Sequence, residues 1–142
     1  MAYRVSVVAD DVNSDIRALG LDLPLVESGA RFKLNYLSID QAVANAKNLL
    51  LTNTGERVML PNFGCNLQNI LFEGLTEERV LEVQSNITEQ FAIWLPYVFL
   101  NQVNVTPKPD ENQLLISVTI SLIQNQFDTR SINLIVLPNI PT

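Results

Sequence analysis

The residues that most often carry out chemistry in proteins are scarce in this sequence. The 142-residue chain contains no histidine, the commonest general base and a common metal ligand. Because a serine or cysteine nucleophile needs a neighbouring base, the histidine-dependent triads are excluded. The single cysteine, Cys65, lies in an apolar stretch, and we interpret it as a buried structural thiol. One cysteine also excludes an intramolecular disulfide and a paired-cysteine metal site.

Carboxylates are the remaining candidates for catalysis. A glycoside hydrolase needs two carboxylates beside one bond, and Glu73, Glu77 and Glu78 lie close together in the sequence. Acidic residues at a helix start usually interact favourably with the positive end of the helix dipole, so they are expected to be structural, and a muralytic enzyme is only the minor alternative. The pairs Asp10-Asp11 and Asp110-Glu111 are typical of solvated turns. The five glycines match no phosphate-binding loop, so we predict no cofactor, no metal site and no catalytic residue.

Composition indicates one folded domain that works through its surface. Hydrophobic residues make up 47% and charged residues 17%, enough to bury a core. The net charge of −6 argues against nucleic-acid binding. Most of the excess acid lies in residues 71–142, which either face a basic partner or form a solvated acidic face. No stretch is apolar enough to span a membrane or to act as a signal peptide, so we expect folding in the cytoplasm and no membrane partner.

Hydrophobic periodicity predicts a first main helix over residues 38–52, with its apolar side chains on one face. Ser38 is the expected N-cap, and Gln41 follows at the spacing of a capping box. Gly55 is expected at the left-handed position that ends the helix.

A second, stronger helix is predicted over residues 76–95. Thr76 is a suitable N-cap, and Pro96 ends the segment. Between the two helices we expect a strand stub at 57–60 and a short helical turn within 67–72.

The last third of the chain is predicted to be sheet. Val103 and Val105 alternate with polar residues, and residues 113–123 alternate over a longer stretch, as in a half-buried antiparallel strand. We expect a polar turn at 125–129 and a final strand at 131–137 that is apolar on both faces. The predicted fold is therefore α+β, with two main helices packed on a small antiparallel sheet that ends in a C-terminal strand pair.

The predicted organisation is an N-terminal arm over residues 1–35, extended or partly ordered, and an α+β domain over residues 36–142. An apolar strand at a sheet edge can accept a strand from another chain through backbone hydrogen bonds. The alternative is that the arm of the same chain covers this edge.

The segment between the two helices resembles the signature of a known family, the baseplate-wedge sheath initiators of contractile-tailed phages, which have a relative in the type VI secretion baseplate. The family pattern is Gly-x-Arg, then Pro-x-Phe-Gly-Cys, then Leu, then Leu-Phe-Glu. It is matched by Gly55, Arg57, Pro61, Phe63, Gly64, Cys65, Leu67, Leu71, Phe72 and Glu73. The resemblance covers about residues 36–137. Family members end the long helix with Glu-Pro-Arg, a motif implicated in docking on wedge proteins, whereas this chain has Leu95-Pro96-Tyr97.

The resemblance implies assembly rather than catalysis. Such a protein docks on the baseplate wedge around the tail tube and templates the first ring of sheath subunits by strand addition. The implied partners are the tail sheath protein, baseplate wedge proteins and the tail tube, with six copies per baseplate. The implied location is the virion tail baseplate, assembled in the host cytoplasm. The alternative is the same role in a bacterial secretion system or a tailocin.

Two interface patches follow from this interpretation. The expected wedge-facing residues surround the Pro-x-Phe-Gly-Cys motif and the end of the long helix: Pro61, Asn62, Phe63, Gly64, Cys65, Leu95, Pro96 and Tyr97. The expected sheath-facing residues belong to the last two strands: Leu115, Ser117, Thr119, Ser121, Ile132, Leu134 and Ile135.

Overall fold

The computed structural model describes residues 18–23, 27–28, 31–32 and 34–138. Most of the predicted arm over residues 1–35 and the Asp10-Asp11 pair lie outside the described residues.

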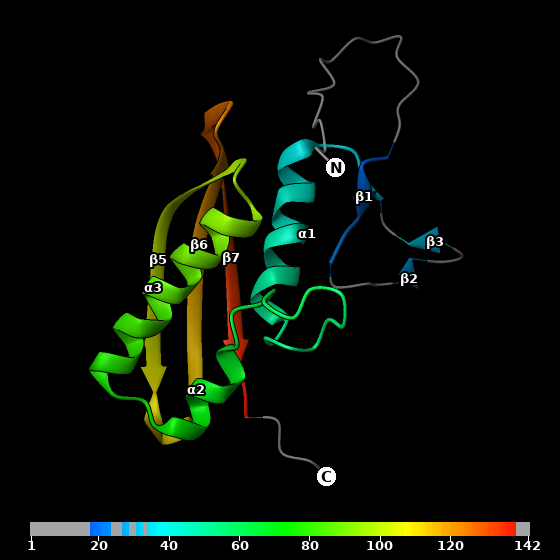
Figure 1. Ribbon diagram of the computed structural model, residues 1–142. Helices are drawn as coiled ribbons and strands as arrows, with labels where there is room; N and C mark the ends of the chain where they lie inside the picture. The colour runs from blue at the N-terminus through cyan, green and yellow to red at the C-terminus, as the bar shows by residue number, and fades with distance from the viewer. Residues whose placement is uncertain (1–17, 24–26, 29–30, 33, 139–142) are drawn as a thin grey trace, which may run out of the picture.

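Three helices are followed by a three-stranded antiparallel sheet, which confirms the predicted α+β class (Figure 1). The helices and the strands, in chain order, are α1 (Ser38–Leu51), α2 (Leu67–Glu73), α3 (Glu77–Trp94), β5 (Val98–Lys108), β6 (Gln113–Leu122) and β7 (Asn125–Val136). A 3-10 turn at Pro109–Glu111 joins β5 to β6. The spatial order of the strands is β5-β6-β7.

The two long helices cover one face of this sheet. α3 packs mainly on β5, α1 packs on β6 and β7, and the helices contact each other. The alternation predicted for β6 is confirmed, because Leu114, Ile116, Val118 and Ile120 are all buried beneath the helices. Burying each such side chain contributes about 1.5–3 kcal/mol to folding.

The ends of the helices agree only in part with expectation. Thr76 caps α3, and its hydroxyl accepts a hydrogen bond from the Arg79 amide at 3.4 Å. The capping box predicted for α1 is wrong: Ser38 is already helical, and its N-cap neighbour Leu37 makes no side-chain cap. Gly55 does have a positive φ of 91°, but it lies in the next turn, because α1 ends at Leu51 with Thr52 as its C-cap.

Two further boundaries differ from the prediction. β7 begins at Asn125, so the expected polar turn at 125–129 lies within a strand, in which Asn125 and Thr129 pair with β6 and the residues between them form an irregularity in the register. Its polar side chains fit a strand because most of them are exposed to solvent. Residues 57–59 form a bend instead of a strand stub, and none of the described strands pairs with them. The short helical turn expected within 67–72 is confirmed as α2.

The described residues before α1 form two small hairpin pairs separate from the main sheet. β1 (Gly20–Leu21) pairs with β4 (Leu34–Asn35), and β2 (Glu27–Ser28) pairs with β3 (Arg31–Phe32). β1 and β4 pack against α1. None of the described residues before α1 therefore pairs with β7.

Candidate functional site

The two edges of the sheet differ in how open they are. β5 carries a bulge between Leu100 and Gln102 and a proline at position 107, both of which hinder pairing with a further strand. β7 runs for 12 residues without a proline, and its one irregularity lies at the hairpin end, opposite Ser121 and Leu122. Within the part of the chain that the structure describes, β7 pairs only with β6. β7 is thus the open edge, and its regularly paired part, from Thr129 to Val136, is roughly 26 Å long at the usual rise per residue.

Charges at this edge are few and are paired within the chain. Arg130 lies 2.7 Å from the carboxylate of Asp128 and 3.8 Å from that of Asp40 on α1. Natural edge strands are commonly protected by unpaired lysines or inward-pointing charges. In β7 the charged side chains Asp128 and Arg130 are instead paired with each other and, for Arg130, with Asp40 on α1. Residues 131–136 of the strand therefore form an uncharged stretch of edge.

The predicted sheath-facing residues divide between the two faces of the sheet. Ile132 is buried and Leu134 half-buried on the helix-covered face, so these two side chains belong to the core. On the opposite face Ile135 is 61% exposed. That face also holds the half-buried Leu115, Ser117 and Thr119 and the buried Ser121, whose hydroxyl donates to Asn101 at 3.2 Å. Any strand added at this edge would therefore contact the β7 backbone first.

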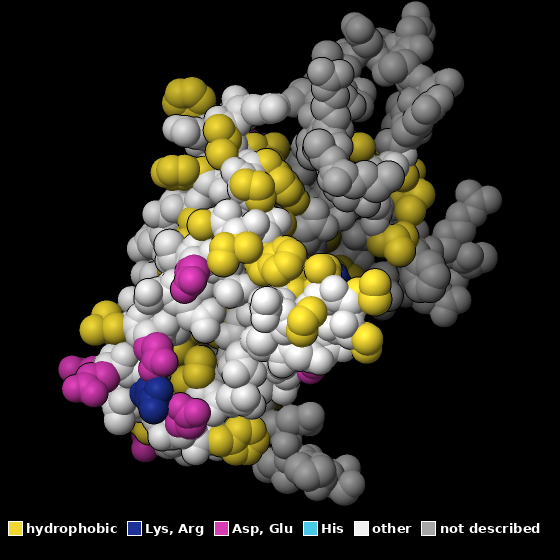
Figure 2. Space-filling model, viewed as in Figure 1, with side chains coloured by type: hydrophobic (Ala, Val, Ile, Leu, Met, Phe, Trp, Pro, Cys, Tyr) yellow, Lys and Arg dark blue, Asp and Glu magenta, His cyan; other side chains and the backbone are white. Residues whose placement is uncertain are grey.

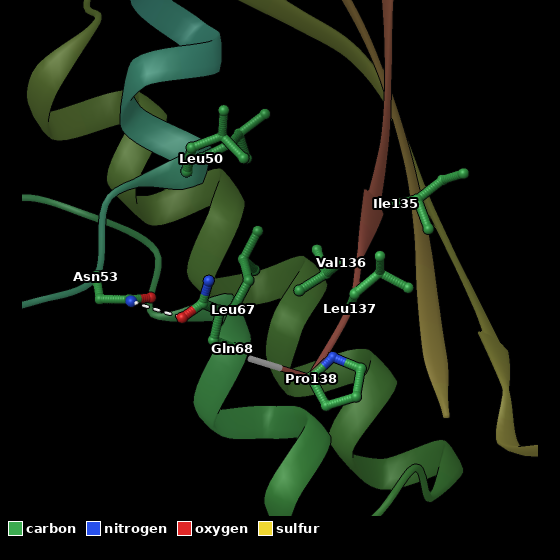
Figure 3. Close-up of a pocket in the computed structure, with 9 residues that line it drawn as sticks. Leu50, Asn53, Leu67, Gln68, Ile135, Val136, Leu137 and Pro138 are labelled. Atoms are coloured by element: carbon green, nitrogen blue, oxygen red, sulfur yellow. Dashed lines mark hydrogen bonds between the residues drawn. The ribbon is translucent and has the colours of Figure 1, made fainter. Parts of the chain in front are cut away.

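A groove of about 470 Å³ lies beside the end of β7 (Figure 3). One wall is formed by the last residues of the strand and those after it, and the other by the end of α1 and the start of α2. Its lining residues are Leu50, Leu51, Asn53, Leu67, Gln68, Ile135, Val136, Leu137 and Pro138. The amide of Asn53 donates to the Gln68 side chain at 3.1 Å across the helical wall. No acidic residue lines the groove, so it offers an apolar slot with two amides rather than a carboxylate pair.

The predicted wedge-facing residues are only partly at the surface. Phe63, Gly64, Cys65 and Leu95 are buried in this chain, whereas the four residues that remain accessible are Pro61, Asn62, Pro96 and Tyr97. The two segments are brought together by an edge-to-face contact between the rings of Phe63 and Trp94, whose centroids are 5.2 Å apart. Tyr97 is half-buried, and its hydroxyl accepts a hydrogen bond from Asn45 on α1 at 2.7 Å.

Electrostatics around these residues favour a structural role. Burial raises the pKa of the Cys65 thiol to about 12, so the thiol stays protonated at neutral pH. Burial also raises the pKa of Tyr97, although the hydrogen bond from Asn45 opposes the shift. Arg79 on the exposed start of α3 pairs with Glu82 at 2.7 Å and with Glu73 at 3.3 Å, and these contacts raise its pKa. Figure 2 shows this acidic cluster around a single basic side chain.

Among the described residues, no group of histidine, cysteine or carboxylate side chains is arranged to hold a metal ion. None of the described helices is both long enough and apolar enough to cross a membrane.

The α1–α2 connection contains two residues that the sequence analysis did not single out. Val58 and Met59 are 93% and 89% exposed, although both are apolar. The sequence predicts a strand stub at these positions, because a short apolar run fits either a strand or an exposed loop.

Comparisons with known proteins agree with the fold and the motif. Residues 38–126, more than half of the chain, match the family model of the baseplate wedge protein gp25. The chain is 33% identical over 86 residues to the baseplate wedge protein gp25 of Enterobacteria phage T4, a match that spans 61% of this chain and 65% of that protein. The match therefore covers slightly less than two thirds of the length of this relative.

Two solved structures share the fold at low identity. A proposed tail lysozyme from Geobacter sulfurreducens superposes with a TM-score of 0.61 at 22% identity, covering 74% of this chain and 96% of that one. A chain of the anti-feeding prophage baseplate superposes with a TM-score of 0.53 at 21% identity, covering 84% and 85%. Because the family model matches all three helices together with β5 and β6, ending where β7 begins, this chain belongs to the gp25 family of baseplate wedge proteins.

Proposed function

We propose that this chain is a structural component of a contractile-tail baseplate and that β7 receives strands from the first ring of sheath subunits. Membership in the gp25 family supports the baseplate location. The observation that carries the templating role is the open edge of β7, a 12-residue strand without proline whose described neighbours leave one side unpaired. In strand addition, backbone hydrogen bonds supply affinity and alternate side chains set the register.

This edge suits a template because its register is strongly specified. Ile132 and Val136 point into the core, so β7 cannot slip by one residue without exposing them. A fixed β7 imposes its own register on any added strand. Repeated around a tail, the same edge would orient every subunit of the first sheath ring alike.

The remaining parts of the proposal follow from the family resemblance. The partners are the tail sheath protein, baseplate wedge proteins and the tail tube, and six copies surround the tube in the virion baseplate after assembly in the host cytoplasm. Residues 1–35 act as an arm on an α+β domain of residues 36–142. On the wedge side, the accessible Pro61, Asn62, Pro96 and Tyr97 are the contact candidates.

A baseplate of a bacterial contractile system is the second candidate. The superposition on the anti-feeding prophage baseplate chain supports it, since that baseplate contains a chain with the same fold. Both candidates assign the same task to β7, so they differ in the particle rather than in the chemistry.

A lysozyme-type activity has weaker support. It rests on the proposed lysozyme from Geobacter sulfurreducens, whose likeness at 22% identity shows the fold alone. Glu73 lies at the surface in an ion pair with Arg79, and no carboxylate lines the groove beside β7. Release of peptidoglycan fragments by the purified chain, abolished by Glu73→Gln or Glu77→Gln, would revive this activity.

A reconstruction of the assembled baseplate at side-chain resolution tests the main proposal. We expect a strand of a sheath subunit beside β7, antiparallel or parallel to it, over residues 131–136. If residues 1–17 of the same chain occupy this edge instead, templating is wrong and the protein is a clamp on the wedge.

A further inference from the structure

The tip of the α1–α2 connection exposes two large apolar side chains in succession. Val58 is 93% and Met59 is 89% exposed, and Leu60 beside them is 39% exposed. Hydrophobic side chains are visible over this connection in Figure 2. Single exposed apolar residues are ordinary, but neighbouring ones on a loop contribute nothing to the chain's own core and need another explanation.

The tip stands on a loop that is closed by hydrogen bonds at its base. The amide of Gly55 donates to the Pro61 carbonyl at 2.9 Å. Glu56 accepts from the backbone amide of Asn53 at 3.0 Å and from its side chain at 2.9 Å. The Asn53 side chain also donates to Gln68 on α2 at 3.1 Å, which joins the loop to the helix that follows.

A second set of contacts fixes the returning side of the loop. The ring of Phe63 is buried, lies edge-on to Trp94 and has the guanidinium of Arg57 at 4.3 Å from its centroid. Its amide donates to Leu60 at 3.1 Å. Gly64 follows with a φ of 120° and lies against the carbonyl of Thr52, a place that no side chain could occupy. Val58 and Met59 are therefore presented by a prearranged loop, which lowers the entropy lost on binding.

We propose that Val58 and Met59 form an apolar plug that inserts into an apolar recess on a neighbouring wedge protein. This inference rests on the proposed baseplate function and names the contact that holds the chain on the wedge. Val58 and Met59 would also add exposed apolar area to the predicted wedge patch, whose large apolar side chains Phe63 and Leu95 are buried. Methionine suits such a plug because its unbranched side chain adapts to the shape of a recess.

Charge argues against a membrane as the occupant. Loops that enter lipid headgroups carry free basic residues, which anionic lipids attract. Here the only basic residue in the loop, Arg57, lies over Phe63, the neighbouring charge is Glu56, and the chain carries a net charge of −6.

Area argues against a second copy of this chain held through the tip alone. A stable interface buries about 800 Å² per partner, far more than two side chains provide. Two apolar residues can instead be the buried anchor of a larger contact, where a few side chains carry most of the binding energy.

The test uses the full chain and the wedge proteins of the same baseplate, purified and mixed. We expect the double variant Val58→Ser, Met59→Ser to bind the wedge at least tenfold more weakly than the natural chain. Leu81→Ser is the matched control, because Leu81 on α3 is also exposed, at 66%. Both variants should keep the thermal unfolding midpoint of the natural chain within a few degrees, since neither removes a buried side chain.

Equal wedge binding by the natural chain and the double variant would overturn the plug while leaving the baseplate role intact. Failure of the natural chain to bind the wedge would overturn the baseplate role and the plug together. A benzophenone side chain at position 59 should cross-link to an apolar segment of a wedge protein in assembled baseplates. Cross-links to a sheath subunit or to a second copy, or binding of the natural chain to anionic phospholipid vesicles, would also overturn the plug.

Discussion

At the scale of single residues, Cys65 shows how burial sets chemistry. Its thiol is fully buried, and its pKa is raised from an ordinary 9.0 to about 12 because burial disfavours the thiolate. The unfolded chain loses this proton above about pH 9, whereas the folded chain keeps it. The free energy of unfolding should therefore fall as the pH rises from 9 towards 12, with a slope from this group of up to ~1.4 kcal/mol per pH unit.

Urea unfolding at a series of pH values measures this slope. Cys65→Ala cannot lose the proton, so its stability should fall less steeply over the same pH range, whatever its stability at pH 7. Parallel slopes for the two proteins would contradict the assignment of the buried thiol.

Phe63 tests whether the motif residues hold the fold or face a partner. The side chain is only 8% exposed and packs on Trp94 and Arg57. We expect Phe63→Ala to lower the free energy of unfolding by about 3–5 kcal/mol, as for other buried aromatic residues. Pro61→Ala, two residues away and exposed, should change it by less than about 1 kcal/mol. Thermal or urea unfolding of both variants tests this prediction. If Phe63→Ala lowers the free energy of unfolding as little as Pro61→Ala does, Phe63 does not contribute to the core.

At the scale of elements, proline substitutions in β7 can distinguish the N–H groups that bond to β6 from those that point to the open edge. Neighbouring residues of an antiparallel strand alternate in direction, so one N–H bonds to β6 and the next points to the open edge. Proline removes an N–H donor. Of the variants Asn133→Pro and Leu134→Pro, one should therefore break the internal ladder and lower stability by about 3 kcal/mol more than alanine at the same position, and the other should leave that ladder intact and remove an outward donor.

The outward variant is the informative one. It should unfold within a few degrees of the alanine variant at the same position, which is the matched control for the lost side chain, and yet fail to nucleate sheath on purified baseplates where that control succeeds, as seen by negative-stain microscopy. Normal sheath growth from a baseplate that carries this variant would contradict strand addition at β7.

The elements also show what the sequence could and could not predict. Periodicity placed α1, α3 and β6 within a residue or two, because their buried faces repeat at the helix or strand period. It missed the first half of β7, where polar side chains at an exposed edge resemble a turn. It also shortened β5, in which asparagines and a proline alternate with Val103 and Val105. For the candidate site, the motif draws attention to the α1–α2 connection, but only the structure shows that Phe63 and Cys65 are buried while Val58 and Met59 are exposed.

At the scale of the whole molecule, the described residues before α1 lie outside the main hydrophobic core. Among the described residues, the main hydrophobic core draws its buried side chains from residues 42–136. The described part of the arm is attached to α1 by polar contacts: the Asn35 side chain donates to Asp40 at 3.4 Å and to Gln41 at 3.3 Å, and Lys47 donates to the Leu23 carbonyl at 2.7 Å. Such contacts contribute about 0.5–1.5 kcal/mol each, much less than the core.

We therefore predict that a chain of residues 36–142 folds without residues 1–35. Its urea unfolding should stay cooperative, with a free energy of unfolding lower by about 1–4 kcal/mol, because a few hydrogen bonds and some packing on α1 are lost. Near-ultraviolet circular dichroism of the single Trp94 should not change, since its contacts with Phe63 and Gln90 lie inside the domain. Asn35→Ala in the full chain should reproduce part of the loss. A truncated chain without a cooperative transition would mean that the arm is part of the folding unit, and the domain boundary at residue 36 would then be wrong.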